Sequence, residues 1–360
     1  MKNFTLFFFY LVSGCAHAQV DTLKLVVHEG IELHGKREYS AAIRMYKSAL
    51  AIDPESALVH YEIAYSYSGL KMYDSAIWHC EKVISAPVKS LALHGMILKG
   101  SAIDDKGDTK GAVEFYRNAL LLYPDDYLLL YNYAVSCERI ALMNEAEIAL
   151  ERALSNRVSH PGSNLKLAYL KKNKGEKVSV IMGLYFFLLL ENDTERSRQA
   201  LRELVVLLYG DARIDTVTTD DRGNRKVSIN IVVESNKDVR AMSAEIGVAA
   251  ITSASMEINK NKPFDERFIF DTEKIFGVLG SIMHDQDRKS RKKKSKKANH
   301  EISDLLWDVY VPYFASLKEA GHAAAFCYHI LNASEDEQLR TLIDFNKEKL
   351  EHFYLWANNN

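Results

Sequence analysis

The stretch YSAAIRMYKSALAIDP, residues 39–54, places two alanines, Ala42 and Ala49, on either side of Tyr46 and closes on Asp-Pro. The same arrangement returns in GAVEFYRNALLLYPDD, residues 111–126. Steps of three and four residues put these side chains on one face of a helix. Proline disfavours helical conformation in the residue before it, so the Asp-Pro ending marks a helix end. The two stretches therefore predict equivalent helices of a repeated unit.

The small residue that opens the second helix of each unit recurs along the chain at intervals of 34, 36, 34 and 34 residues, at Ala42, Ala76, Ala112, Ala146 and Val180. A second series of small residues marks the first helix of each unit, at Gly30, Ala64, Gly100, Ala134 and Ala168. A glycine or alanine there lets the partner helix approach closely, while a large residue fills the gap beside it. One helix pair cannot bury both of its apolar faces, so such units stack in series.

Over residues 23–192 the sequence resembles the tetratricopeptide repeat (TPR) family, whose unit is a 34-residue helix–turn–helix. The resemblance implies an α-solenoid of about five repeats, of which the two outer ones deviate most. Residues 193–210 start with an Asp-Thr cap signal and have helical spacing of leucines. This segment is expected to be the capping helix that closes the array. Domain 19–210 is thus predicted to be a repeat array.

From residue 211 the pattern changes, and residues 211–360 are predicted to form a mainly helical module. Residues 220–224 lie between two β-branched stretches, which predicts a β-hairpin. The expected helices of this module are residues 237–256, 272–286, 301–320, 322–332 and 334–356. An aromatic stripe at Trp307, Tyr310, Tyr313 and Phe314 is expected to be core, docking the module onto itself or onto the end of the repeats. Pro312 is expected to kink or start its helix.

The N-terminus, residues 1–18, has an early lysine, an apolar run and small residues, as in a bacterial signal peptide. Cleavage at Ala16-His17-Ala18 would leave Gln19 first, whereas a lipobox-like stretch would make Cys15 a lipid-bearing terminus. Both alternatives predict export to the periplasm or cell envelope. The mature protein would be periplasmic or secreted in the first case and lipid-anchored in the second.

Charge is nearly balanced, with 46 basic and 48 acidic side chains, so the whole chain carries no bias toward nucleic acid. The run RKSRKKKSKK, residues 288–297, predicts a solvated basic loop over residues 287–299. The alternative to a simple linker is an accessory basic surface at Lys292, Lys293 and Lys294 that contacts anionic lipid or a partner protein. Nucleic-acid binding is not predicted, because no aromatic residues alternate with the lysines to stack on bases.

Motifs for catalysis are scarce. Cys80, Cys137 and Cys327 are too few for a disulfide framework and are predicted to be buried. The spacing of His322, Cys327 and His329 places the cysteine and the histidines on different helix faces. No metal-ligand or phosphate-loop motif occurs, so neither a metal nor a cofactor is predicted.

The resemblance implies that the first helices line the concave side of the array. Inner-face positions would include Val27, Ile31, His34, Ser68, Ser101, Asp104, Glu138, Leu165 and Lys172. The predicted partner-binding residues are Tyr61, Tyr65, Ile97, Tyr131, Val135 and Tyr169. Tyrosine offers a large rigid surface and one hydroxyl, which suits a protein or peptide partner. The alternative for single tyrosines is packing between adjacent units.

Chaperone-binding TPR proteins bind the carboxylate terminus of a partner with a set of lysines and asparagines. This sequence lacks that set at the inner-face positions. We therefore predict a non-enzymatic, exported adaptor or scaffold of the bacterial cell envelope that binds a peptide or protein segment. One alternative is an enzyme with its site in residues 211–360 and repeats that recruit substrate. Another is a structural lipoprotein that tethers a complex.

Overall fold

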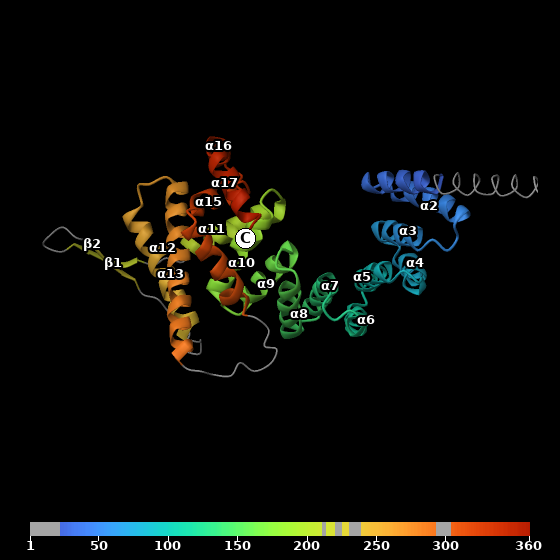
Figure 1. Ribbon diagram of the computed structural model, residues 1–360, viewed down its shortest axis with the longest axis horizontal. Coiled ribbons are helices and arrows are strands. Elements are labelled where there is room, and N and C mark those ends of the chain that lie inside the picture. The colour runs from blue at the N-terminus through green and yellow to red at the C-terminus, as the bar shows by residue number, and fades with distance from the viewer. Residues whose placement is uncertain (1–21, 211–213, 220–224, 230–238, 293–303) are drawn as a thin grey trace, which may run out of the picture. The chain divides into compact units, whose positions relative to one another are not determined.

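The computed structural model describes residues 22–210, 214–219, 225–229, 239–292 and 304–360, with side chains for 22–210, 239–285 and 304–360. The predicted signal peptide with Cys15 lies outside the described residues, as do the hairpin turn and residues 293–303. Contacts between residues divide the chain into two compact units, Met1–Ala149 and Leu150–Asn360 (Figure 1).

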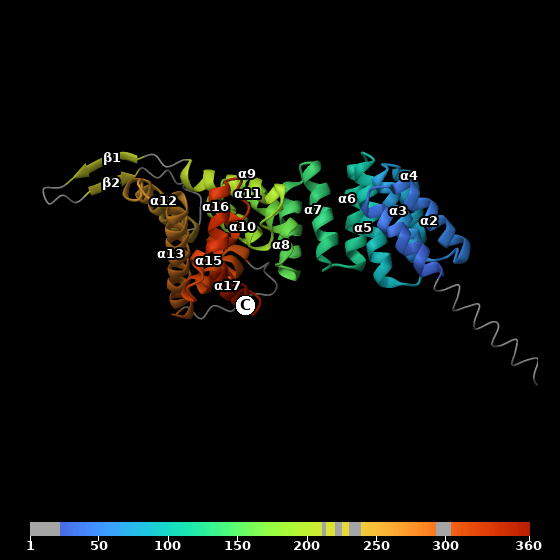
Figure 2. The same cartoon turned by 90° about the horizontal axis from the view of Figure 1, so that it is seen from above.

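The repeats predicted from the sequence are present as helix pairs, and the chain is a TPR-like, mostly α-helical solenoid. The first helix that the structure describes in the first unit covers residues 22–35. It continues with α2 (Tyr39–Ile52), α3 (Ala57–Gly69), α4 (Tyr73–Ser85), α5 (Lys89–Asp105), α6 (Thr109–Leu122), α7 (Tyr127–Arg139) and α8 (Met143–Asn156), the last of which crosses into the second unit. Consecutive helices from α2 to α7 pack against each other in series (Figure 2).

The turns inside the helix pairs all use one residue in left-handed conformation. Positive φ angles of 63°, 60°, 106°, 61° and 70° occur at Arg37, Lys71, Gly107, Ala141 and Gly175. The following amide donates to the carbonyl five residues earlier, as in Met72 N–H to the Tyr67 oxygen at 2.9 Å. This is the hydrogen bond of a Schellman ending. The turn residues recur at the intervals counted in the sequence, which confirms the repeat register.

Close packing inside the pairs follows the predicted small–large pattern. A Cβ built on Gly30 would lie 2.4 Å from the Tyr46 ring, and one on Gly100 would lie 2.3 Å from the Tyr116 ring. Both tyrosine side chains are almost completely buried. The small residues of the second helices are also buried, at Ala42, Ala49, Ala76, Ala112, Ala119, Ala146 and Ala153.

The second unit is built around α10 (Lys177–Leu190), which pairs with α9 (Pro161–Asn173). Its residues from Val180 to Leu188 are buried on every side. The Tyr185 ring lies 5.3 Å from that of Phe276 and 5.8 Å from that of Phe326, and its hydroxyl is 2.7 Å from the Thr272 hydroxyl. The apolar helix α10 is therefore the centre of this unit.

The other elements of the second unit follow α10 in the chain. They are α11 (Glu195–Tyr209), the strands β1 (Ile214–Thr219) and β2 (Arg225–Ile229), α12 (Val239–Ile258), α13 (Phe264–Lys292), a π-helical turn η1 (Leu306–Tyr310), α14 (Val311–Glu319), α15 (Ala323–Leu331), α16 (Glu337–Phe345) and α17 (Lys347–Ala357). The strands pair antiparallel, with Thr219 opposite Arg225. The predicted hairpin is thereby confirmed.

The aromatic stripe predicted to be core is largely buried. Trp307, Tyr310 and Phe314 are 5%, 3% and 0% exposed. The Phe314 ring stacks on that of Phe276 at 4.6 Å, and the Tyr310 hydroxyl donates to Asn164 Oδ1 at 2.7 Å. The stripe therefore joins the C-terminal helices both to each other and to α9. Pro312 lies in the first turn of α14, as expected.

Three expectations for the C-terminal helices need correction. Helix α13 is far longer than residues 272–286 and continues to Lys292. The basic loop predicted for 287–299 is therefore helical over residues 287–292, which continue a helix that begins with an amphipathic stretch. Residues 334–356 form two helices, α16 and α17, separated at Asn346, which leaves the helical region with φ −114° and ψ 22°.

The compact units differ from the segments defined by the repeat pattern. Helices α9 to α11 are the last helices of the repeat sequence. Their contacts nevertheless assign them to the second unit, together with the C-terminal helices. A division of roles between residues 19–210 and 211–360 stays a prediction.

Candidate peptide-binding surface

Four rings form a continuous row across three first helices of the first unit. On α3 the rings of Tyr61 and Tyr65 stack at 6.4 Å. Tyr65 stacks on His34 of the preceding first helix at 4.5 Å, and Tyr61 meets His94 of α5 edge-on at 6.2 Å. We call His34, Tyr65, Tyr61 and His94 the aromatic row. It brings two of the predicted partner-binding residues into contact with two histidines.

Polar contacts hold the ends of the aromatic row in place. His34 Nδ1 lies 2.8 Å from the Ser66 hydroxyl of α3, and the ring of Tyr39 lies edge-on against His34 at 5.0 Å. His94 Nδ1 donates to the Ser90 carbonyl oxygen at 2.8 Å. A surface whose side chains are already fixed loses little conformational entropy when a partner binds.

The aromatic row is partly exposed and lies among apolar side chains. Tyr65 is 48% exposed, and on the same helices Ile31 and Leu58 are 45% and 48% exposed. Burial lowers the pKa of His34, while burial and then the Glu62 carboxyl raise the pKa of Tyr61. Near pH 7 these two members of the row are therefore uncharged. The surface favours an uncharged, apolar or aromatic stretch of a partner.

The other predicted residues lie on neighbouring first helices or in the second unit. Ile97 is on α5, and Tyr131 and Val135 are on α7; all three are partly buried. Helix α3 contacts α5, and α5 contacts α7, so the first helices form one surface. Tyr169 belongs to α9 of the second unit, where burial and then Glu203 raise its pKa. Of the six, Tyr61 and Tyr65 are the pair whose rings stack on each other in the aromatic row.

The side chains of the accessory residues predicted from the sequence are not among those that the structure describes. The backbone of Lys292 ends α13, and its side chain lies beyond those that the structure describes. Lys293, Lys294 and Cys15 lie outside the described residues altogether. The basic surface and the lipid attachment remain predictions.

Sequence reasoning placed His34 only among general inner-face positions and missed Leu58 and His94. A signal for the last two existed, because residues 58 and 94 occupy the same place in consecutive repeats. The repeat pattern does not show which aromatic rings of neighbouring helices come into contact.

Asp104, which we predicted on the inner face, is instead buried and links two helices. It is buried, accepts hydrogen bonds from Thr109 and Ser136 at 2.7 and 2.8 Å, and pairs with Arg139 at 3.0 Å. A buried carboxylate with all these partners joins α5 to α7 and offers nothing to a ligand.

None of the three cysteines among the described residues has the lowered thiol pKa that a catalytic cysteine needs. Burial raises the pKa values of Cys80, Cys137 and Cys327 to about 12, 11 and 12. A thiol is nucleophilic as the thiolate, so these are inert core residues, as predicted. In the same part of the chain no three His, Cys, Asp or Glu side chains gather as metal ligands. None of the described helices is both long and apolar enough to cross a membrane.

Similarity to known proteins was found among solved structures. No family model and no curated protein matches the chain. Solved structures similar to it are TPR proteins, including TTC0263 of Thermus thermophilus, with 17% identity over 52% of this chain and 98% of that chain at a TM-score of 0.43. Another is pilF of Pseudomonas aeruginosa, with 18% identity over 52% of this chain and 85% of that chain at a TM-score of 0.45.

A third similar structure is YrrB, described as a TPR protein with an unusual peptide-binding site, with 17% identity over 49% of this chain and 89% of that chain at a TM-score of 0.35. These TM-scores are all below 0.5. The fold therefore rests on this chain's own helix pairs and turns.

Proposed function

We propose that the chain is an exported adaptor of the bacterial cell envelope whose aromatic row binds a peptide or protein segment. The single observation that supports this most is the run of four contacting rings across three first helices, half-exposed and fixed by hydrogen bonds. Aromatic side chains that present large rigid area dominate the energetics of protein interfaces. Export rests on the signal-like residues 1–18 of the sequence.

A peptide segment fits this surface better than a charged terminus. Apolar Ile31 and Leu58 lie on the same helices as the row, and burial raises the pKa of Glu62, the residue next to Tyr61 in the chain. Binding of an apolar segment there would remove water from few charged groups. It would also bury apolar area, which contributes about 25 cal/mol per Å².

The test compares Tyr65→Ala and Tyr61→Ala with Trp78→Ala, a control at a 52%-exposed aromatic of α4 outside the aromatic row. Each protein is immobilised and exposed to solubilised envelope fractions, and the captured partners are quantified. We expect the two row variants to lose at least tenfold of the captured partner, whereas the control retains it.

A photo-crosslinking amino acid at position 65 should then join the same partner, and one at position 78 should not. Equal capture by the row variants and the native protein would contradict the proposed surface. Location is tested separately by mass spectrometry of the mature N-terminus. An acylated Cys15 indicates a lipid anchor, and Gln19 indicates a periplasmic or secreted protein.

A further inference from the structure

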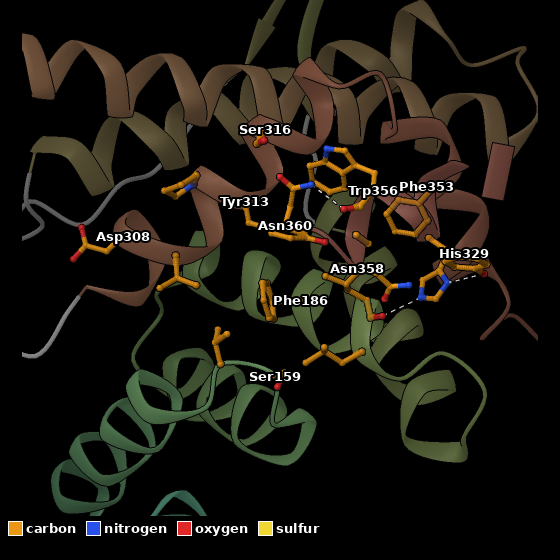
Figure 3. A pocket seen from close by; sticks show the side chains of 17 residues that line it. Ser159, Phe186, Asp308, Tyr313, Ser316, His329, Phe353, Trp356, Asn358 and Asn360 are labelled. Carbon is orange, nitrogen blue, oxygen red and sulfur yellow. Dashed lines mark hydrogen bonds between the residues drawn. The ribbon is translucent and has the colours of Figure 1, made fainter. Parts of the chain in front are cut away.

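The second unit contains a cavity of about 610 Å³ that none of the functions above uses (Figure 3). Five segments converge on it: the loop between α8 and α9, the end of α10, η1 with α14, α15 and α17. This volume lies within the range of 300–1,000 Å³ that is usual for pockets that hold small molecules.

One wall of the cavity is aromatic. The ring of Tyr313 lies 5.5 Å from that of Phe186 and 5.6 Å from that of Trp356. Phe186 and Phe353 are buried, whereas Tyr313 and Trp356 are partly open to the cavity. Leu189 and Leu190 of α10 extend the apolar lining. The cavity therefore offers a ligand the partly exposed side chains of Tyr313, Trp356, Leu189 and Leu190.

The charge of the lining is negative. Asp308 is exposed at the cavity and accepts one hydrogen bond, from the Asp304 N–H at 3.0 Å. Among the described residues it has no cationic partner, and no lysine or arginine lines the cavity there. Figure 3 shows Asp308 and His329 toward opposite ends of the lining, with Phe186 between them.

His329 adds no positive charge to this lining. Its Nε2–H donates to the Leu189 carbonyl oxygen at 3.0 Å, and its Nδ1 is 3.1 Å from the Tyr354 hydroxyl. Burial lowers the pKa of His329, so the ring is neutral near pH 7. The backbone oxygen holds the proton on Nε2 and leaves Nδ1 as an acceptor.

We propose that this cavity binds a small amphiphilic cation, an alkylated ammonium group carried on an apolar body. The ammonium group lies beside the Asp308 carboxylate, and the apolar body extends along the partly exposed rings of Tyr313 and Trp356. A cation near an aromatic face is attracted by the ring quadrupole, and this attraction grows when water is excluded. An anionic ligand would meet Asp308 with no basic side chain to compensate.

The test is isothermal titration of the full chain with three matched probes. These are 4-phenylbutyltrimethylammonium, neutral 4-phenylbutanol and anionic 4-phenylbutyrate. We expect one-to-one binding of the cation, about tenfold tighter than the alcohol, with the carboxylate weakest. Equal affinity for the cation and the alcohol, or no binding of the cation, would overturn the proposal.

Two variants and one control locate the site. Asp308→Asn keeps an oxygen that can accept from the Asp304 N–H, and it should remove most of the preference for the cation while leaving the alcohol unchanged. Trp356→Leu should weaken both probes. Glu348→Gln, at an exposed position of α17 away from the cavity, should change neither.

An unchanged preference in Asp308→Asn would contradict the proposal, and it would do so even if Trp356→Leu failed to fold. The result is independent of the aromatic row, because that row lies in the first unit and the cavity lies in the second. Failure of one proposal therefore leaves the other to its own test.

Discussion

At the scale of single residues, the volume of the small member of each helix pair varies with that of its large partner. Glycine faces tyrosine in two pairs, where the ring occupies the place of a Cβ. Alanine occupies the equivalent position where the residue 16 positions later is smaller than tyrosine. The pairs are Gly30 with Tyr46, Gly100 with Tyr116, Ala64 with Cys80 and Ala168 with Leu184. Because cores are close-packed, the two positions must change together.

We predict that Gly100→Ala destabilises the chain by about 1–3 kcal/mol, because the new Cβ would lie 2.3 Å from the buried Tyr116 ring. Urea unfolding followed by circular dichroism measures the change. The control is Gly35→Ala, where a Cβ meets nothing within 4 Å, so helix propensity alone should stabilise by up to about 1 kcal/mol.

The double variant Gly100→Ala/Tyr116→Leu should recover part of the lost stability, since alanine with leucine is the combination at Ala168 and Leu184. Full additivity of the two single substitutions would show that the pair is not coupled.

A second residue-scale prediction concerns a buried histidine pair of α3 and α4. His60 Nδ1 and His79 Nδ1 lie 2.8 Å apart, and His60 Nε2 lies 3.2 Å from the Pro54 carbonyl oxygen. His60 therefore donates from Nε2 and accepts from His79. Burial, then His60 and Lys47, lowers the pKa of His79 to about 4.

The unfolded chain takes up this proton near pH 6.5, whereas the folded chain resists it until about pH 4. Stability from His79 is thus fully present above pH 6.5 and is lost as the pH falls toward 4, by about 1–3 kcal/mol. We expect His79→Gln to flatten this loss in urea unfolding at pH 7.0, 5.5 and 4.5. The exposed His28→Gln serves as control, and an unchanged slope in His79→Gln would refute the assignment.

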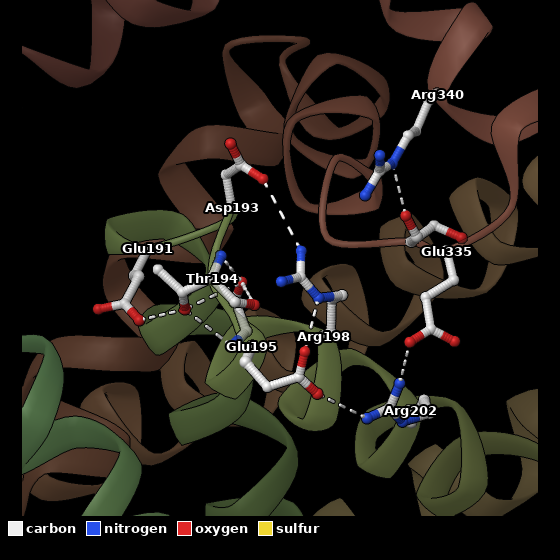
Figure 4. A network of polar contacts seen from close by, with 10 residues as sticks. Glu191, Asp193, Thr194, Glu195, Arg198, Arg202, Glu335 and Arg340 are labelled. Atoms are coloured by element: carbon white, nitrogen blue, oxygen red, sulfur yellow. Dashed lines mark hydrogen bonds and ion pairs between the residues drawn. The ribbon is translucent and has the colours of Figure 1, made fainter.

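At the scale of elements, α11 is held by a capping box and by a surface network (Figure 4). The Thr194 hydroxyl oxygen accepts from the Ser197 N–H at 3.1 Å, and the Thr194 N–H donates to the Ser197 hydroxyl oxygen at 2.7 Å. Arg202 joins Glu195 of the same helix to Glu335, between α15 and α16, at 3.5 and 2.8 Å.

The cap should contribute more than the ion pairs, because both carboxylates and Arg202 are more than half exposed. We predict that Thr194→Ala costs about 1 kcal/mol of unfolding free energy. Arg202→Ala should cost less than about 0.5 kcal/mol, a difference that vanishes at 1 M salt. A larger effect of Arg202→Ala that persists in salt would show that the network is more than a solvated surface feature.

Elements of the repeat region could be predicted because each unit carries its own packing signal, a small residue, a large one and a fixed spacing. The C-terminal elements carry no such signal. Helix α13 begins at Phe264, where no alanine or glycine series marks a start, and the break at Asn346 has neither proline nor glycine. Of the candidate surface, Tyr61 and Tyr65 were predictable from repeat position, whereas the contact with His34 and His94 depends on tertiary packing.

A turn of the repeat kind also occurs in the C-terminal helices. Between α14 and α15, Gly321 has φ 78°, and the His322 N–H donates to the Leu317 oxygen at 3.0 Å. The hydrogen bond spans five residues, as in the turns of the repeats. The position that is small in the repeats is Phe314 here, whose large ring stacks on Phe276 of α13 and also lies 5.2 Å from Phe326 of α15. The turn is therefore shared while the packing of the pair is not.

At the scale of the whole molecule, α10 connects the end of the repeat sequence to the C-terminal helices. The Tyr185 ring lies within 6.4 Å of four phenylalanine rings, all beyond residue 210, at Phe268, Phe276, Phe314 and Phe326. Residues 211–360 thus bury the side chains of α10. In an isolated repeat array, one capping helix would bury the last repeat.

We predict that a chain shortened to residues 19–210 does not remain a folded monomer, because α10 would expose the aromatic side chains that the missing helices cover. Exposed apolar patches of this kind lead to association. The shortened chain should bind a fluorescent apolar dye and elute as aggregates in size-exclusion chromatography with light scattering. A second shortened chain, residues 19–156, lacks α10 altogether and should bind less dye per residue. A monomeric, cooperatively unfolding 19–210 chain would mean instead that α11 alone covers α10, and that the C-terminal helices are an independent domain.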